Sequence, residues 1–360
     1  MTKSAEKQGS THERTVLEDA WERFATYDLN AVTVQQQFYR LRIWILAVGV
    51  AATALAIVYA HVTDSNERPA FGDWRFPLWL AVIVAPILGT VLTAGASKLA
   101  RGADWIHLRG AAEAAKREIY RYRCRVGDYA PTAAAAADDD ALSEDATTDD
   151  ATADEATAGG DLTRDERLSA VITAITARLM DSEILGASLK PYAGPLPPKY
   201  GAGGGDDGFS DLSPATYLEW RLADQQAFFR SKSQALDHRH RRFQWAISAL
   251  GGLGTLLAAV GREIWVPVSV GLATALGAYL ELRNVESTLA GYNRAAMELD
   301  NIVTWWSGLS PAQREDPVRF ETLIDRTEAL LASENATWSQ GMQEALAQLD
   351  KSSKAEKKGS

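Results

Sequence analysis

Four stretches that are almost free of charged residues constrain this fold more than any other feature. Two of them, Ile43–Val62 and Pro77–Ser97, approach the roughly 20 residues that a helix needs to cross a bilayer core. The other two, Trp245–Val260 and Trp265–Leu282, are shorter and closely joined. We interpret them as a second membrane hairpin, with a hairpin buried in a soluble core as the alternative. The expected fold is an all-α membrane protein with four spans in two hairpins that continue into a cytoplasmic helical bundle.

Basic residues gather on one side of both hairpins. Arg40 and Arg42 precede the first span, and eight Lys or Arg residues lie between 98 and 125, after the second. The run from His238 to Arg242 precedes the third span in the same way. Because cytoplasmic loops are enriched in Lys and Arg, we expect both termini to be cytoplasmic in a multi-pass protein of a prokaryotic cytoplasmic membrane.

The two halves of the chain repeat one order of features. Each has a polar helix, a basic edge followed by Trp, a hairpin rich in small residues, and a long helix returning to the cytoplasm. This order indicates an internal duplication into units 12–129 and 213–350. Apolar residues at alternating steps of three and four predict coiled-coil-like seams, which could pack helices within or between subunits. The candidate assembly seam consists of Trp105, Ile119, Tyr122, Leu289, Leu299 and Trp306.

The segments between the units have a different composition. Residues 130–161 are rich in Ala, Asp and Thr, supply much of the net charge of -10, and are expected to form an acidic disordered linker. Residues 162–212 are expected to form a helix and a Pro- and Gly-rich connecting loop. We interpret Gly201–Gly205 as a flexible loop or hinge, because no strand precedes it and no Gly-Lys-Ser or Gly-Lys-Thr follows. After Ser310 and Pro311, a final amphipathic helix should pack on the bundle.

No pattern of residues predicts enzyme chemistry, a cofactor or a metal site. His238 and His240 are two residues apart, which places them on different faces of a helix with no Cys or carboxylate cluster beside them. No basic and aromatic pattern predicts nucleic-acid binding. The single Cys124 cannot form an intrachain disulfide, which suits a reducing compartment. The first 40 residues do not have the pattern of a removable signal peptide.

Small and hydroxyl-bearing residues recur inside the four stretches. Small residues let helices approach closely, and a stripe of hydroxyls could instead line a pore. Deep Asp, Glu, Lys or Arg residues are not found in these stretches, which argues against ion-coupled transport. The candidates for span packing or pore lining are Gly49, Thr53, Gly89, Thr93, Gly251, Thr255, Gly271 and Thr274.

With its duplicated hairpins and flanking helices, the chain resembles the SLATT-like bacterial and archaeal two-transmembrane families, whose name describes effectors associated with nucleotide-signalling conflict systems. In the first half, the resemblance is carried by Arg109, Glu113, Lys116, Glu118, and Tyr120 through Tyr129. In the second half, it is carried by Tyr217, Arg221, Asp224, Gln225, Phe229, Glu334 and Trp338. The chain departs from the simplest members because it is a tandem and carries no sensor domain.

The resemblance implies a membrane effector that perturbs or permeabilises the bilayer when an associated sensor is triggered. The expected partners are the lipid bilayer, further copies of the chain, and a cytoplasmic sensor protein. The leading hypothesis is an oligomeric, channel-like membrane effector. The alternative is a non-conducting membrane-anchored helical scaffold for protein partners.

Overall fold

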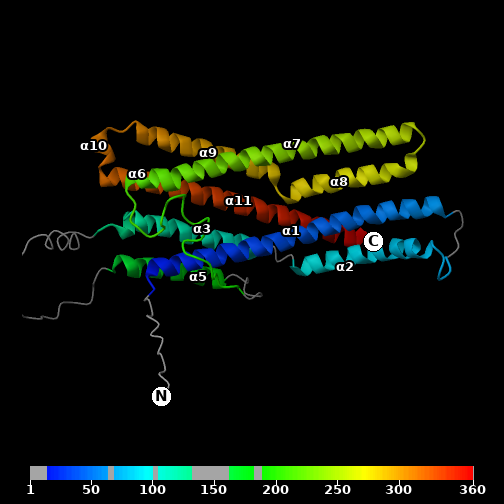
Figure 1. The fold of residues 1–360 in the computed structure, drawn as a ribbon, viewed down its shortest axis with the longest axis horizontal. Helices are drawn as coiled ribbons and strands as arrows, with labels where there is room; N and C mark the ends of the chain where they lie inside the picture. Colours follow the sequence, from blue (N-terminus) through cyan, green and yellow to red (C-terminus); the bar gives the residue numbers. More distant parts are fainter. Residues whose placement is uncertain (1–13, 64–68, 100–103, 132–161, 182–188, 360) are drawn as a thin grey trace, which may run out of the picture.

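A computed structural model describes residues 14–63, 69–99, 104–131, 162–181 and 189–359. Within these ranges the chain is helical and contains no strand, which confirms the all-helical part of the prediction. The predicted acidic linker at 130–161 lies almost wholly outside the described residues. Figure 1 shows an elongated molecule in which two helical hairpins project from the same end of a helical bundle.

The first unit begins with one very long helix, α1 (Val16–Val62). Thr15 caps its start by accepting from the Glu18 amide, while the Glu18 carboxylate accepts from the Thr15 amide. No proline interrupts it, so the helix runs from the bundle into the hairpin. The other elements of this unit are α2 (Phe76–Leu99), α3 (Asp104–Arg123) and the 3-10 turn η1 (Gly127–Tyr129). Helix α5 (Arg164–Asp181) follows and packs on α1 and α3.

The second unit repeats this order. A bundle helix continues into a hairpin, whose second arm is followed by a helix that returns to the bundle (Figure 1). Its elements are α6 (Pro214–Tyr217), the π-helical turn η3 (Leu218–Leu222), α7 (Ala223–Ala259), η4 (Glu263–Trp265), α8 (Val266–Leu282), α9 (Val285–Ser307), α10 (Pro311–Arg314) and α11 (Pro317–Gly359). Helix α11 packs on α9 and α3, so the last helix joins the two units.

The main core lies in the bundle and contains residues of both units. Trp21, Ile119, Leu168, Leu299 and Leu323 come from α1, α3, α5, α9 and α11, and the exposed fraction of each is 0%. Burial of large apolar side chains is the main favourable term in folding, at roughly 1.5–3 kcal/mol for each such side chain. The two units therefore share one core and stabilise each other.

The Gly-rich loop packs closely against the bundle. Trp21 Nε1 donates to the Gly208 carbonyl at 2.7 Å, so the loop is tied to the centre of the core. A side chain at Gly203 would place its Cβ 2.3 Å from the Trp220 carbonyl oxygen. The glycines thus permit a close approach between the loop and the neighbouring helices. Side chains of α3 also donate to the carbonyls of this region, since Lys116 Nζ bonds the Tyr200 carbonyl and the Tyr120 hydroxyl bonds the Gly201 carbonyl.

A buried ion pair also holds this loop. Arg123 Nη1 donates to Asp206 Oδ2 at 2.9 Å, and both side chains have an exposed fraction of 0%. Arg123 Nε donates to the Ser210 carbonyl at 2.9 Å. The guanidinium of α3 therefore binds the loop through both its carboxylate and its backbone.

Three described helical segments are long and apolar enough to cross a membrane: Val16–Val62, Phe76–Gly95 and Glu263–Ser307. The predicted span at 245–260 is not among them. It forms the end of α7, where the apolar part is shorter than the roughly 20 residues of a typical span. Apolar membrane helices are therefore present, and three rather than four of them meet the length and composition of a span.

Candidate functional site

The helices of the two hairpins lie in a row. Helix α7 packs on α8, α8 packs on α1, and α1 packs on α2, so that α7 and α2 form the two ends (Figure 1). A closed four-helix bundle would bring the end helices together and give the helices a common core. In the row, apolar side chains point to the outside instead, as the exposed Leu80, Val91 and Leu256 show. The row therefore exposes apolar side chains along its length.

The predicted Gly and Thr residues lie along these helices, but they do not converge on one path. The hydroxyls of Thr53, Thr93 and Thr255 each donate to the carbonyl four residues earlier, at Gly49, Gly89 and Gly251. Thr274 is exposed. A Cβ built at Gly271 would lie 4.0 Å from Cγ2 of Val50 in α1. A Cβ at Gly49 or Gly251 would meet nothing within 4 Å. Within one chain, these hydroxyls therefore bond their own helices.

A different glycine makes the closest approach between hairpin arms. A Cβ built at Gly254 would lie 2.8 Å from the Ser269 Oγ. Ser269 is buried, and its hydroxyl donates to the Val266 carbonyl at 2.9 Å. The absence of a side chain at Gly254 favours this close packing of α7 and α8. Gly254 is not among the candidate packing residues selected from the sequence, because its role depends on the partner helix.

An aromatic cluster connects the hairpins to the bundle. We call it the junction, and it consists of Phe38 and Tyr39 of α1, Trp105 and Ile106 of α3, Leu282 of α8, and Trp338 and Met342 of α11. The Trp105 ring contacts the Trp338 ring edge-on at a centroid distance of 5.3 Å and lies 6.3 Å from the Tyr39 ring. Trp105 is fully buried. Four helices of both units therefore meet where the hairpins leave the bundle.

Cations cover the edges of the junction. Arg283, at the end of α8, places its guanidinium 3.8 Å from the centroid of the Tyr39 ring. Arg109 of α3 places its guanidinium 5.0 Å from the Trp338 ring. Such contacts are attractive because the ring face carries partial negative charge. These two contacts connect α8 to α1 and α3 to α11.

A sharp bend separates α8 from α9 beside the junction. Asn284 adopts a left-handed conformation with φ 45° and ψ 46°, which Asn tolerates better than most residues. A Cβ at Gly341 of α11 would lie 3.0 Å from the Asn284 Nδ2. The bend therefore rests directly on α11.

The predicted seam residues lie mainly inside the single chain. Ile119, Tyr122, Leu299 and Trp306 belong to the main core, and Trp105 belongs to the junction. Leu289 is half-buried on α9. In this structure, therefore, the seam packs helices of one chain against each other.

A buried ion pair links η3, the turn just before α7, to α11. Arg221 Nε and Nη2 donate to Glu328 Oε1 and Oε2 at 2.9 Å each, and the Tyr217 hydroxyl donates to Glu328 Oε1 at 3.0 Å. The Arg221 guanidinium also lies 4.3 Å from the Tyr120 ring of α3. Burial and the neighbouring Glu328 carboxylate raise the pKa of Tyr217 well above its ordinary value, so its proton stays in place to donate.

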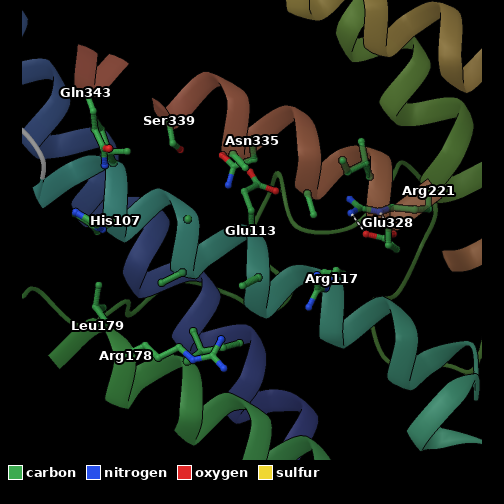
Figure 2. A pocket seen from close by; sticks show the side chains of 18 residues that line it. His107, Glu113, Arg117, Arg178, Leu179, Arg221, Glu328, Asn335, Ser339 and Gln343 are labelled. Atoms are coloured by element: carbon green, nitrogen blue, oxygen red, sulfur yellow. Dashed lines mark hydrogen bonds and ion pairs between the residues drawn. The ribbon is translucent and has the colours of Figure 1, made fainter. Parts of the chain in front are cut away.

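The Arg221–Glu328 pair forms the inner end of a pocket of about 380 Å³. Figure 2 shows its walls: α3 carries His107, Glu113 and Arg117, α5 carries Arg178, and α11 carries Asn335, Ser339 and Gln343. Its other end reaches Ile106 of the junction. Sequence reasoning missed the pocket because its walls come from helices far apart in the chain.

A second, smaller pocket of about 170 Å³ lies between α9 and α11. Glu334 and Trp338 line it from α11. Burial raises the pKa of Glu334 to about 7, opposed by the Arg109 guanidinium and reinforced by the Glu113 carboxylate. A carboxyl group that titrates near neutral pH therefore lies one turn from the junction. In the described part of the chain, no group of three or more His, Cys, Asp or Glu residues could hold a metal ion.

Two family models match the chain, one in each unit. Residues 217–338 match the SMODS and SLOG-associating 2TM effector domain 1. Residues 217–338 are SLATT-like. This match confirms the resemblance for the second unit, and the SLATT-like segment contains the α7–α8 hairpin, α9, the Arg221–Glu328 pair and the Trp338 end of the junction. Residues 22–137 match a family described as a protein of unknown function, DUF4231. No curated protein and no solved structure matches the chain.

The matched model is described as a two-transmembrane effector domain, and this description agrees with the apolar helices of the structure in indicating a membrane protein. Each family match covers one hairpin and the helices beside it. Residues 138–216 lie between the two matches and belong to neither.

Proposed function

We propose that this chain is a four-span membrane effector that assembles with further copies of itself and permeabilises the cytoplasmic membrane when its cytoplasmic bundle receives a signal. The row of hairpin helices is the observation that carries the proposal. A row has no interior of its own, so a water-filled path requires several rows arranged around an axis. Each chain would supply one segment of the wall.

Two observations support the end of α7 as the fourth span. The family description of residues 217–338 refers to two transmembrane helices, and α7 and α8 form the hairpin within that range. Trp245 is 77% exposed at the start of the apolar part of α7, and Trp44 is 61% exposed at the corresponding place in α1. Trp is enriched at membrane–water interfaces, so both helices enter the bilayer at similar depths in this proposal. The basic residues before these Trp residues support cytoplasmic termini.

The junction supplies the means of control. A sensor protein acting on α3 or α11 would move Trp105 and Trp338; the Trp338 ring contacts Trp105, and the Trp105 ring contacts Tyr39 of α1 in the membrane row. Because packed interiors rearrange between discrete states rather than deform continuously, a small movement of α11 would be transmitted to α1 and α8.

Flux through liposomes tests the proposal. The purified full-length chain would be reconstituted in liposomes that contain a small self-quenched dye, and its assembly in nanodiscs would be measured by light scattering. A variant with Trp338→Ala, which loosens the junction, supplies an activated state without the natural signal. We expect an oligomer and dye release that increases in this variant. A monomer that still releases dye would refute the assembly requirement.

The alternative function is a non-conducting scaffold. It is favoured by the hydroxyls of Thr53, Thr93 and Thr255, which bond their own helix backbones rather than a common path. An oligomer that releases no dye, either unchanged or with Trp338→Ala, would support the scaffold and refute permeabilisation.

A further inference from the structure

The larger pocket lies where helices of the two units meet, between α3, α5 and α11. Its volume of about 380 Å³ falls within the range of small-molecule sites. Such sites occur preferentially at the boundaries between domains. The pocket is thus large enough for a small organic ligand and lies where a ligand would touch both units.

Basic side chains dominate the wall formed by α3 and α5. His107 and Arg178 make no hydrogen bond or ion pair to another described residue, while Arg117 contacts Glu118 at 3.0 Å. The charge of Arg221 is neutralised by Glu328. Glu113 is the remaining carboxylate of the lining, and Figure 2 shows it on the side that faces α11. The α5 side of the pocket is therefore the side that attracts an anion.

Neutral polar groups form the opposite wall. Asn335, Ser339 and Gln343 follow one another at four-residue steps along α11, so they lie on one face of that helix. None of the three side chains bonds another described residue, and each can donate and accept hydrogen bonds. Ile106, Ile175 and Leu331 provide apolar surface between the two walls.

We propose that this pocket binds a small organic anion with an apolar body. Its anionic group lies against Arg178, its apolar body lies on Ile175 and Leu331, and its hydrogen-bonding groups face the polar stripe of α11. A ligand in this position holds α5 and α3 against α11. Because the pocket rests on side chains of the bundle alone, the inference does not depend on whether the membrane row conducts.

Reaction rates at an introduced thiol test the charge of the pocket. Ser339→Cys places a thiol in the lining with little change in volume, and the native Cys124 is buried. The purified full-length variant in neutral detergent is treated with a negatively charged sulfonatoethyl or a positively charged trimethylammonium-ethyl methanethiosulfonate. The ratio of the two rates reports the local potential. The chain without the Ser339 change supplies the background.

Two arginine variants make the test specific. Arg178→Gln should lower the anion-to-cation rate ratio at position 339 by roughly fivefold, as expected for the loss of one charge several ångströms away in water. Arg319→Gln is the matched control, because Arg319 is exposed on α11 but does not line the pocket. This control should leave the ratio unchanged. A ratio that does not respond to Arg178→Gln would overturn the proposal.

Naphthalene-1-sulfonate tests occupancy, since it combines an anionic group with an apolar body. It should slow thiol labelling at position 339 in a saturable manner, and Arg178→Gln should raise the concentration required. Labelling that is unaffected by this probe, or that is slowed equally in both backgrounds, would also overturn the proposal. Neither outcome bears on dye release, so failure of the pocket and failure of the proposed function are distinguishable.

Discussion

Breaking the buried Arg221–Glu328 pair should destabilise the protein more than breaking any exposed pair. The side chains are only 4% and 1% exposed, two hydrogen bonds of 2.9 Å join them, and Tyr217 adds a third contact to the carboxylate. Glu328→Leu leaves a guanidinium in the core without its anion, and Arg221→Met leaves a carboxylate without its cation. Each change should cost about 3–5 kcal/mol, because an unpaired charge stays buried.

The double variant separates a paired interaction from ordinary packing loss. Arg221→Met together with Glu328→Leu removes both charges and keeps much of the apolar volume, so its cost should be far below the sum of the single variants. The matched control is Arg230→Met with Asp300→Leu, a pair whose side chains are 56% and 42% exposed. Exposed pairs contribute about 0–1 kcal/mol.

Thermal unfolding in detergent, followed by circular dichroism, provides the measurement. A loss of 3–5 kcal/mol should lower the midpoint by about 10 °C for a chain of this size, whereas each Arg230 or Asp300 variant should shift it by at most a few degrees. If the losses in unfolding free energy of the two single variants summed to the loss of the double variant, Arg221 and Glu328 would not be coupled. If the exposed pair cost as much as the buried pair, burial would not be the cause.

Three further predictions concern the junction, the hairpins and the titratable carboxyl. Trp105→Ala should lower the free energy of unfolding by about 3–5 kcal/mol, because the ring is fully buried. Trp44→Ala, at a position that is 61% exposed, should lower it far less in detergent. Equal losses in the two variants would contradict the packing of Trp105 in the junction. Gly254→Val should loosen the α7–α8 hairpin and speed hydrogen exchange in both helices, because its Cβ would lie 2.8 Å from the Ser269 Oγ. Gly251→Val is the control, since a Cβ there meets nothing within 4 Å and should leave the exchange rates unchanged. Faster exchange in the Gly251 variant than in the Gly254 variant would refute the packing. The pKa of Glu334 is raised from its ordinary 4.5 to about 7. The contribution of this carboxyl to the free energy of unfolding should therefore be greatest below pH 4.5 and should fall by about 2–3 kcal/mol as the pH rises to 7. Glu334→Gln should remove this fall, and a pH profile that the substitution leaves unchanged would show that the carboxyl is not perturbed.

The helices and the hairpins could be predicted from the sequence because their signals are local. Apolar steps of three and four predicted that Ile119 and Leu299 would face other helices, and both are fully buried. The choice of partner was not predictable, since the same step pattern suits packing within a chain and between chains. The structure uses these residues within one chain.

The candidate site could not be predicted because it depends on long-range pairing. Arg221 and Glu328 are 107 residues apart, and no local pattern joins them. The same holds for Gly254, whose role depends on the position of Ser269. The close packing of the Gly-rich loop could not be predicted, because glycines are common both in flexible loops and where backbone passes close to large rings. The number of spans stayed open because the apolar part of α7 is close to the minimum length for crossing a bilayer.

The uninterrupted α1 helix gives the molecule an equal-armed lever. Tyr39, which packs in the junction, lies midway between Val16 and Val62, so each arm is about 35 Å long at 1.5 Å per residue. If the junction acts as the pivot, displacement of the bundle arm produces an opposite displacement of nearly equal size at the far end of the hairpin. Such a lever neither amplifies nor attenuates movement. Since α2 and α8 both pack on the outer arm, one tilt of α1 would carry both hairpins, and the two units would respond as one.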